Sequence, residues 1–177
     1  EHGIAYLHGK SVRERALALI NIADPKFRSQ LLQAAKSQKY VYADQIELDT
    51  EKIRYPEELQ HYETLNDGTE IFFRPVKPTD ETALAEMLYS LSETSIRKRY
   101  MTQTMAFPHK DVQQLTNIDY VNTLTIVGTV PGVSGEDIVA IGQYYLNPKT
   151  LSAEVAFIVL DEWQQKGMGT LMLNYLT

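Results

Sequence analysis

Two glycines precede an apolar helical repeat in the segment DEWQQKGMGTLML (161–173). Gly167 and Gly169 each cost a helix about 1 kcal/mol relative to alanine at this place. Glycine lets an anion approach the backbone, and the first turn of a helix offers unpaired N–H groups and a partial positive charge. Lys166 adds a positive charge beside them. The spacing Gln164-x-x-Gly167-x-Gly169 therefore predicts a phosphate-binding turn, with an ordinary loop as the alternative.

A carboxylate interrupts the strand-like segment that comes before this turn. LSAEVAFIVL (151–160) is apolar on both alternating faces, which is typical of a central strand, except at Glu154 and at Ser152 near its start. Burial of a carboxylate among apolar neighbours is costly and raises its pKa toward the range of a general base. Glu154 is thus a candidate base. The alternative is a glutamate that faces a solvent channel or a nearby arginine.

Other reactive patterns are weak. No Gly-Lys-Ser/Thr follows at P-loop spacing, and a Rossmann fingerprint would need a third glycine. The four histidines have no ligand spacing and the chain has no cysteine, so we expect neither a metal site nor thiolate chemistry. The basic segment SIRKRY (95–100) is interpreted as a solvated helix face that could border an acceptor site. Trp163 is expected to pack beneath the loop, and Asp161 and Glu162 to shape the turn.

Composition narrows the class of protein. The 177 residues are 44% hydrophobic and 23% charged, with a net charge of −6, which is typical of a globular protein and argues against a nucleic-acid surface. No apolar run reaches the roughly 18 residues of a membrane span, and no signal-peptide pattern opens the chain. We therefore expect a cytoplasmic protein with no nucleic-acid or membrane partner.

The predicted elements that position the glycine turn form an α/β sandwich on a largely antiparallel sheet. A hairpin is expected around Asn66-Asp67-Gly68. A helix capped by Thr79 follows, then a second helix in SETSIRKRYM (92–101). Strands are expected at 121–130, 137–146 and 151–160, and a last helix begins at Gly167.

The N-terminal part is predicted to be helical. Ser11 and Glu14 form a capping box. Asp24-Pro25 starts a second helix, with Phe27, Leu31 and Ala34 or Ala35 on its apolar side. Residues 41–60 are interpreted as a linker with a short helix after Pro56. Because the chain begins without methionine and ends within a helical repeat, we expect it to be a piece of a longer polypeptide.

Residues 61–177 resemble the GNAT acetyltransferase superfamily, in which Gln/Arg-x-x-Gly-x-Gly/Ala stands at this place. More narrowly, they resemble the bacterial protein lysine acetyltransferases that are fused to acyl-CoA synthetases. The matching segments, in order, are IFFRPVKPTDE (71–81), LSETSIRKRY (91–100), NIDY (117–120) and SAEVAFIVLDEWQQKGMGTLML (152–173). The resemblance implies the GNAT fold, with helices flanking a mostly antiparallel central sheet.

The resemblance also implies acetyl-CoA as cosubstrate and Glu154 as the catalytic base. The backbone of Phe157, Ile158 and Val159 is expected to pair with the pantetheine amides. The pyrophosphate is expected on the turn made by Gln164, Gln165, Lys166, Gly167, Met168, Gly169 and Thr170. Gln165 stands where a small residue is common. The family's final strands and helix do not follow, so we expect a fold that is incomplete at its C-terminus and lacks its general acid.

Residues 1–40 resemble the C-terminal end of the acetyl-CoA hydrolase/transferase family. The resemblance rests on EHGIAYLHGKSVRERALALINIADPKFRSQLL (1–32). It implies a fusion in which the remainder of that enzyme is a partner, although its catalytic glutamate lies outside this chain. Two functions follow as hypotheses: acetylation of a protein lysine, or less directly of a small amine, and acetyl-CoA or CoA sensing without catalysis.

Overall fold

The computed structural model of the protein describes residues 3–46, 55–101, 106–132 and 135–176. The chain divides into two units, Glu1–Arg54 and Tyr55–Thr177. Each unit is described by itself.

Both helices of the first unit begin at the polar residues that predicted them. Helix α1 (Val12–Asn21) starts after Ser11, whose backbone N–H donates to Glu14 Oε2 at 2.8 Å while its hydroxyl accepts from the Glu14 N–H. Helix α2 (Pro25–Ser37) starts after Asp24, which accepts from the Lys26 N–H at 3.2 Å. Both predicted helix starts are confirmed.

The two helices pack through a small apolar cluster made of Ile20, Leu32, Ala35 and Val41. The predicted apolar side of α2 is wrong at Phe27 and Leu31, whose exposed fractions are 49% and 42%, and confirmed at Ala35, which is buried. The buried face of α2 lies one residue further along, at Arg28, Leu32 and Ala35. Arg28 can be buried there because its Nε donates to the Ala23 carbonyl. Several large apolar side chains of this unit therefore face outward.

The second unit opens with the predicted hairpin. A short helix, η1 (Glu57–Leu59), follows Pro56 as expected. Strands β1 (His61–Thr64) and β2 (Glu70–Pro75) then pair antiparallel around the Asn66-Asp67-Gly68 turn. Asp67 accepts from the Thr69 N–H, and Gly68 has a φ of +85° that favours glycine.

Three further strands complete a five-stranded antiparallel sheet. They are β3 (Thr123–Gly132), β4 (Gly135–Asn147) and β5 (Ser152–Val159), and the strand order is β1-β2-β3-β4-β5. Within the described residues β5 pairs with β4 alone, so the prediction of a central strand is wrong. Helices α4 and α6 contact the two faces of β5. These contacts explain why β5 has apolar residues on both faces although it is not flanked by a strand on each side.

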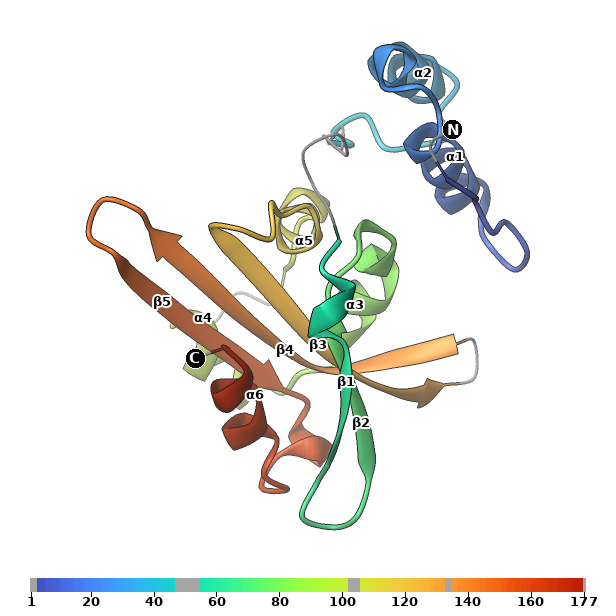
Figure 1. Ribbon diagram of the computed structural model, residues 1–177. Coiled ribbons are helices and arrows are strands. Elements are labelled where there is room, and N and C mark those ends of the chain that lie inside the picture. Colours follow the sequence, from blue (N-terminus) through green and yellow to red (C-terminus); the bar gives the residue numbers. More distant parts are fainter. Residues whose placement is uncertain (1–2, 47–54, 102–105, 133–134, 177) are drawn as a thin grey trace. The chain divides into compact units, whose positions relative to one another are not determined.

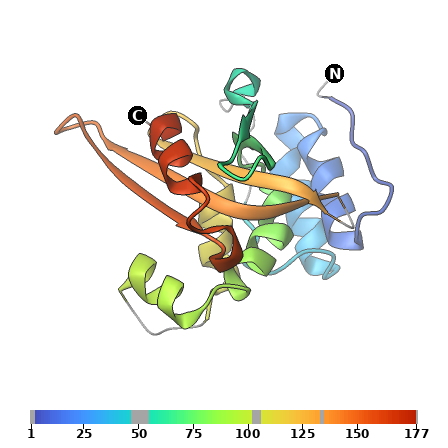
Figure 2. The same cartoon turned by 90° about the horizontal axis from the view of Figure 1, so that it is seen from below.

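Helices cover both faces of the sheet (Figure 1 and Figure 2). On one face lie α3 (Glu81–Tyr89), α4 (Glu93–Tyr100) and α5 (His109–Thr116). On the other lies α6 (Met168–Leu176), whose Met168 and Met172 are fully buried. The sequence predicted α3, α4 and α6 but not the short α5. The α/β architecture on an antiparallel sheet is confirmed.

A buried ion pair displaces the predicted start of α3. Asp80 accepts from Arg74 through both carboxylate oxygens, at 2.7 and 3.0 Å, and also from the Lys77 N–H. Residues Pro78–Asp80 therefore form a separate turn, η2, and α3 begins at Glu81. The prediction that Thr79 caps this helix is wrong, because the Arg74 guanidinium fixes the preceding turn. Arg74 Nε also donates to Glu136 of β4 at 2.8 Å.

Substitution of Arg74 tests how far the second unit depends on this pair. Arg74→Met leaves the buried Asp80 carboxylate without its cation, so we expect a loss of about 3–5 kcal/mol in the free energy of unfolding. Glu136→Gln should cost less than about 1 kcal/mol, because its side chain is 44% exposed. Urea unfolding followed by fluorescence of Trp163, the single tryptophan, measures both. Equal losses of unfolding free energy in the two variants would show that the Arg74–Asp80 pair does not stabilise the second unit more than the Arg74–Glu136 contact does.

Candidate functional site

A cleft of about 620 Å³ lies between α4, β5 and the first turn of α6. Nine of the predicted cofactor-binding residues line it: Phe157, Ile158, Val159, Gln164, Gln165, Gly167, Met168, Gly169 and Thr170. The structure thus brings together the strand and the glycine turn that were singled out separately in the sequence. Two predicted residues, Glu154 and Lys166, are not among the residues that line the cleft.

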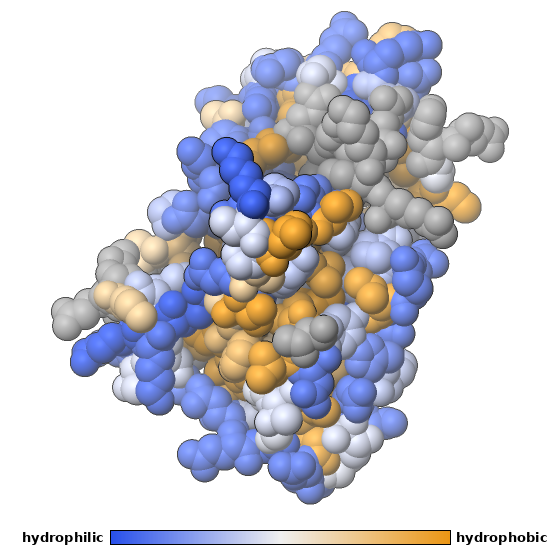
Figure 3. Space-filling view, turned by 60° about the vertical axis from the view of Figure 1, so that its left-hand side comes forward, coloured by the Kyte–Doolittle hydropathy of each residue, from blue (hydrophilic) through white to orange (hydrophobic). Residues whose placement is uncertain are grey.

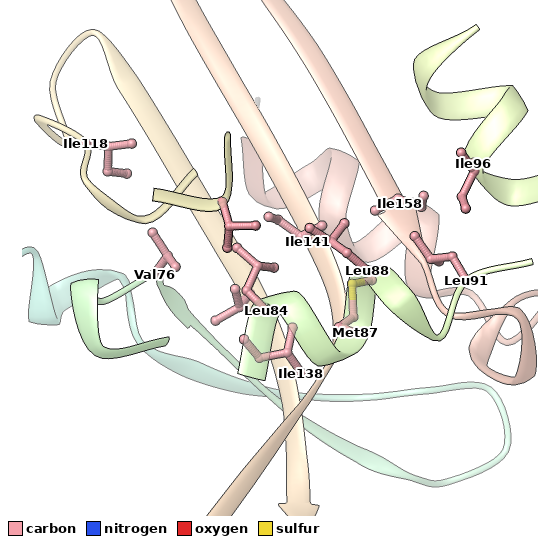
Figure 4. Close-up of a cluster of buried hydrophobic side chains, with 12 residues drawn as sticks. Val76, Leu84, Met87, Leu88, Leu91, Ile96, Ile118, Ile138, Ile141 and Ile158 are labelled. Atoms are coloured by element: carbon pink, nitrogen blue, oxygen red, sulfur yellow. The ribbon is translucent and has the colours of Figure 1, made fainter. Parts of the chain in front are cut away.

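The floor of the cleft rests on the apolar layer between the sheet and its helices. Ile158 lines the cleft and belongs to the buried cluster, together with Ile96 of α4 and Leu91 just before it. These three side chains gather where α4 approaches β5 (Figure 4). In Figure 3 the left-hand side of Figure 1, where β5 lies, comes forward, and apolar side chains gather in the middle of that surface. The cleft therefore offers an apolar base with polar walls.

The glycine turn places bare backbone at the helix start. Gly167 has a φ of +92°, and a Cβ there would lie 3.1 Å from Asn66 Nδ2, so a side chain would be strained. Gln165 has a φ of +62°, a left-handed conformation that favours glycine. Gly169 differs, because a Cβ there would meet only Phe157 at an ordinary 3.6 Å. Its glycine leaves room for a ligand at the unpaired N–H groups of α6.

Hydrogen bonds tie the turn to α4. The Asp161 carboxylate accepts from the Ser92 N–H at 2.9 Å, from the Ser92 hydroxyl at 2.7 Å and from the Ser95 hydroxyl at 2.8 Å. The backbone hydrogen bond from Ser92, reinforced by the two hydroxyls, lowers the pKa of Asp161. Gln164 Nε2 donates to Ser95 Oγ and to the Val159 carbonyl. The Gln164 side chain thus holds the turn, and Asp161 shapes it as predicted.

Lys166 turns away from the cleft. Its Nζ lies 3.1 Å from Asp67 Oδ2 and 4.9 Å from the centre of the Trp163 ring. Hydrogen bonds from Thr69 and Lys166 lower the pKa of Asp67 to about 2. The Lys166 charge is paired with Asp67 in this structure, and its role beside a bound phosphate stays a prediction. Trp163 packs against the Leu65 and Met168 cluster, as expected for a residue beneath the loop.

The cations of the cleft come from α4 instead. Lys98 and Arg99 line it, together with Ser95, so part of the basic segment 95–100 faces the cleft. The sequence left this open, because helical spacing does not show which face of α4 meets the sheet. The pattern Ser95-x-x-Lys98-Arg99, one helical turn apart, was the available signal.

Glu154 lies on β5 opposite Tyr145 of β4 and is exposed. The expectation of a carboxylate buried among apolar neighbours is wrong, because the first residues of β5, Ser152–Glu154, are all exposed. Glu154 shares its face of the sheet with Ala156, two residues along, which lines the cleft. A base at Glu154 would therefore act from the end of the cleft that is open to water.

The described residues contain no group of three histidine, aspartate or glutamate side chains that could hold a metal ion. Within the same segments, no helix is long and apolar enough to cross a membrane.

The first part of the chain resembles a known family in sequence. Residues 1–35 match the acetyl-CoA hydrolase/transferase C-terminal domain. The 4-hydroxybutyrate coenzyme A transferase of Clostridium kluyveri is 58% identical over 36 residues. Those residues are 20% of this chain and only 8% of the relative.

Among solved structures, the GNAT domain of S. lividans PAT has a TM-score of 0.63 and 24% identity, and the match covers 70% of this chain and 72% of that one. A cAMP-binding acyltransferase from Mycobacterium smegmatis has a TM-score of 0.40 and 18% identity, with 86% of this chain and 39% of that one covered. The likeness to the S. lividans domain shows that the chain has the GNAT fold.

Substitution of Gly169 tests the phosphate-binding turn. Gly169→Glu places a carboxylate at the helix start, so we expect CoA binding to weaken at least about tenfold, or roughly 1.4 kcal/mol. Gly169→Ala should keep the fold, because the Cβ meets only ordinary contacts, and should weaken CoA binding less than Gly169→Glu because it adds no charge. Calorimetric titration with CoA measures the affinities.

Asn174→Glu adds the same charge to the exposed, C-terminal part of α6 and serves as the control. It should leave CoA affinity within about twofold, since position 174 lies more than one turn away from the N–H groups at the start of α6. Unchanged CoA affinity in Gly169→Glu would show that the anion is not bound at this turn.

Proposed function

We propose that the second unit binds acetyl-CoA in this cleft and transfers the acetyl group to an amine, most directly a protein lysine. The observation that carries the proposal is the meeting of the β5 backbone and the glycine turn in one cleft, within a GNAT fold. The proposal adds an activity to the likeness in fold. Substitutions of residues in and beside the cleft can test it.

The cleft suits an extended, phosphorylated cofactor. The pyrophosphate would lie on the first turn of α6, beside Gly169, with the N–H groups as donors. The pantetheine arm would run along the open edge of β5 at Phe157–Val159, in the manner of an added strand. Lys98 and Arg99 supply positive charge on the facing wall. This arrangement leads the thioester along β5 toward Glu154.

The chemistry needs a neutral amine. The acceptor nitrogen attacks the thioester carbonyl carbon, the C–N bond forms, the C–S bond breaks and CoA leaves as a thiolate. A proton must leave the nitrogen, and Glu154 is proposed to accept it, directly or through water. Its exposed position keeps the carboxylate within reach of a substrate that approaches from solvent.

The same exposure favours a protein as the acceptor. A lysine side chain on another protein can approach the open edge of β5 without entering an enclosed pocket. A small amine, such as a polyamine, would need binding groups of its own in the cleft, and we propose it only as a lesser substrate class.

A second proposed function is the sensing of acetyl-CoA or CoA without catalysis. It is favoured by the position of Glu154, which is not among the residues that line the cleft. If the carboxylate does not meet the acceptor, the cleft could bind acetyl-CoA or CoA and regulate an attached enzyme without catalysis. The two proposals differ in one observable, which is the release of free thiol from bound acetyl-CoA in the presence of amine.

The first unit is proposed to belong to an acetyl-CoA hydrolase/transferase domain. We assign residues 1–40 to the tail of that domain, 41–60 to a linker and 61–177 to the acetyltransferase domain. The exposed apolar side chains of the helices, among them Val12, Leu19 and Phe27, would pack against the remainder of that enzyme. Both parts of the chain would then handle acyl-CoA.

Substitution of Glu154 tests the acetyltransferase proposal. Glu154→Gln keeps the size of the side chain but removes its ability to accept a proton. We expect the acetylation rate at pH 7 to fall by about 10²–10⁴ with nearly unchanged acetyl-CoA affinity. The deficit should shrink at high pH, where the acceptor amine is already neutral. Thiol release with a lysine peptide measures the rate, and calorimetry measures the affinity.

Glu162→Gln removes an exposed carboxylate from the neighbouring loop and should leave the rate unchanged. Full activity in Glu154→Gln would assign Glu154 a structural role. Tight acetyl-CoA binding by the parent protein, with no thiol release to lysine peptide or polyamine, would favour the sensing function.

A further inference from the structure

The floor of the cleft changes from apolar to polar along β5. On the face under α4, Ile158 of β5 stands opposite Ile141 of β4, and both belong to the buried cluster (Figure 4). Two residues earlier on β5, Ala156 stands opposite Gln143, whose side chain is polar but only 3% exposed. Alternate residues of a strand, and paired residues of neighbouring strands, share one face of the sheet. The row of Ala156 and Gln143 is therefore the next part of the floor toward the start of β5.

One cation of the cleft wall reaches down to this polar row. Arg99 of α4 lines the cleft, and its Nη2 donates to Gln143 Oε1 at 2.9 Å. Gln143 Nε2 in turn donates to the Tyr145 hydroxyl at 2.7 Å and to Thr125 Oγ1 at 3.5 Å. The buried amide is thus held at both ends, and it holds the guanidinium. Arg99 therefore has a fixed place over the floor of the cleft, close to Ala156.

The charge of Arg99 is not neutralised by its neighbours. Within the segments that the structure describes, the guanidinium bonds to Gln143 and lies 4.9 Å from the centre of the Tyr100 ring, and it pairs with no carboxylate. Burial raises the pKa of Tyr145 against the opposing charge of Arg99, so the Tyr145 hydroxyl stays protonated and neutral.

A half-buried guanidinium in the wall of a cleft is suited to one kind of ligand group. Arginine carries several N–H donors, and the bond to Gln143 uses only one of them. The planar fork matches a carboxylate, which it binds through a pair of parallel charge-assisted hydrogen bonds. Arg99 is therefore placed to meet a carboxylate that enters the cleft above Ala156.

We propose that Arg99 binds a carboxylate at the far end of the acyl group, so that the cleft selects acyl-CoA molecules with a dicarboxylic acyl chain over uncharged ones of equal length. The inference rests on the proposed function, in which the pantetheine arm runs along Phe157–Val159 and the thioester leads toward Glu154. The acyl chain then lies over Ala156, whose small side chain leaves room beside Gln143. The transfer step is unchanged, because this carboxylate is remote from the thioester carbon and takes no part in the bond exchange.

An acidic residue beside the acceptor lysine is the alternative source of the carboxylate. Arg99 is half-buried and bonded to a side chain of the sheet, whereas Lys98 is exposed on the same helix. A side chain of a protein acceptor would meet Lys98 first, at the surface. The acyl chain, in contrast, is held over the floor by its bond to the cofactor. These positions favour the acyl group.

Calorimetric titration of the full chain with succinyl-CoA and with butyryl-CoA tests the proposal. The two acyl chains have equal length and differ in the terminal group, which is a carboxylate in the first and a methyl group in the second. We expect succinyl-CoA to bind about tenfold more tightly, because a charge-assisted hydrogen bond that is partly exposed to water contributes about that much. Equal affinities, or tighter binding of butyryl-CoA, would overturn the proposal.

Two variants test Arg99 independently. Arg99→Gln removes the charge, and Gln143→Glu keeps Arg99 but places a carboxylate of the protein against it. In both we expect the affinity for succinyl-CoA to fall about tenfold, while that for butyryl-CoA stays within about threefold and shows that the cleft is intact. If one variant loses butyryl-CoA as well, the other decides. An affinity ratio that stays at the parental value in an intact cleft would overturn the proposal.

Arg97→Gln is the matched control. It removes the same charge from an exposed position of α4 that is not among the residues lining the cleft. The ratio of the two affinities should stay at about tenfold, since an exposed charge outside the cleft is screened by water and salt. A ratio that falls as far in Arg97→Gln as in Arg99→Gln would show a general effect of charge and overturn the assignment to Arg99.

The titrations separate this inference from the proposed function. Equal binding of both acyl-CoA molecules defeats the inference and leaves the proposed function standing, whereas no binding of acetyl-, butyryl- or succinyl-CoA defeats both. Selective binding of succinyl-CoA without thiol release supports the inference together with the sensing function. Faster acetylation of a lysine peptide with a neighbouring aspartate, lost in Arg99→Gln and without preference for succinyl-CoA, would place the carboxylate on the acceptor and overturn the proposal.

Discussion

The cleft exists because one carboxylate joins two distant parts of the chain. Asp161 accepts three hydrogen bonds from Ser92 and Ser95 at the start of α4, and Gln164 adds a fourth link through Ser95. These contacts hold α4 beside the turn that follows β5. Without them the wall that carries Lys98 and Arg99 would not face the glycine turn, and the N–H groups of α6 would open directly to solvent.

The position of β5 in the sheet also shapes the cleft, because the faces of this strand and its outer edge have different neighbours. Helices α4 and α6 contact β5, whose last residues Ile158 and Val159 are buried, while its outer edge is unpaired within the described residues. An extended ligand can therefore meet free backbone groups and apolar floor at the same strand. The same edge leaves Glu154 and Tyr145 exposed as a cross-strand pair. Binding and proton transfer are thus proposed at opposite ends of one strand.

Buried polar side chains of the second unit form hydrogen bonds with partners from other helices, strands and turns. Arg74 joins β2, the η2 turn and β4 through Asp80 and Glu136, much as Gln143 joins α4 and β4 through Arg99 and Tyr145. In each case a buried group needs partners from different segments, because an unpaired polar atom in this layer would cost several kcal/mol. These networks position the sheet, the helices and the proposed base relative to one another.

The sequence alone determined the features that depend on neighbouring residues: the capping box at Ser11, the hairpin at Asp67-Gly68, and the glycine turn before α6. It also identified the GNAT fold, because the order of local patterns is specific. Only the tertiary structure decided that β5 is an edge strand, that Glu154 is exposed and that Lys166 pairs with Asp67. The physical reason is that exposure and ion pairing depend on which segments meet in space, whereas caps and turns are settled within a few residues of the chain.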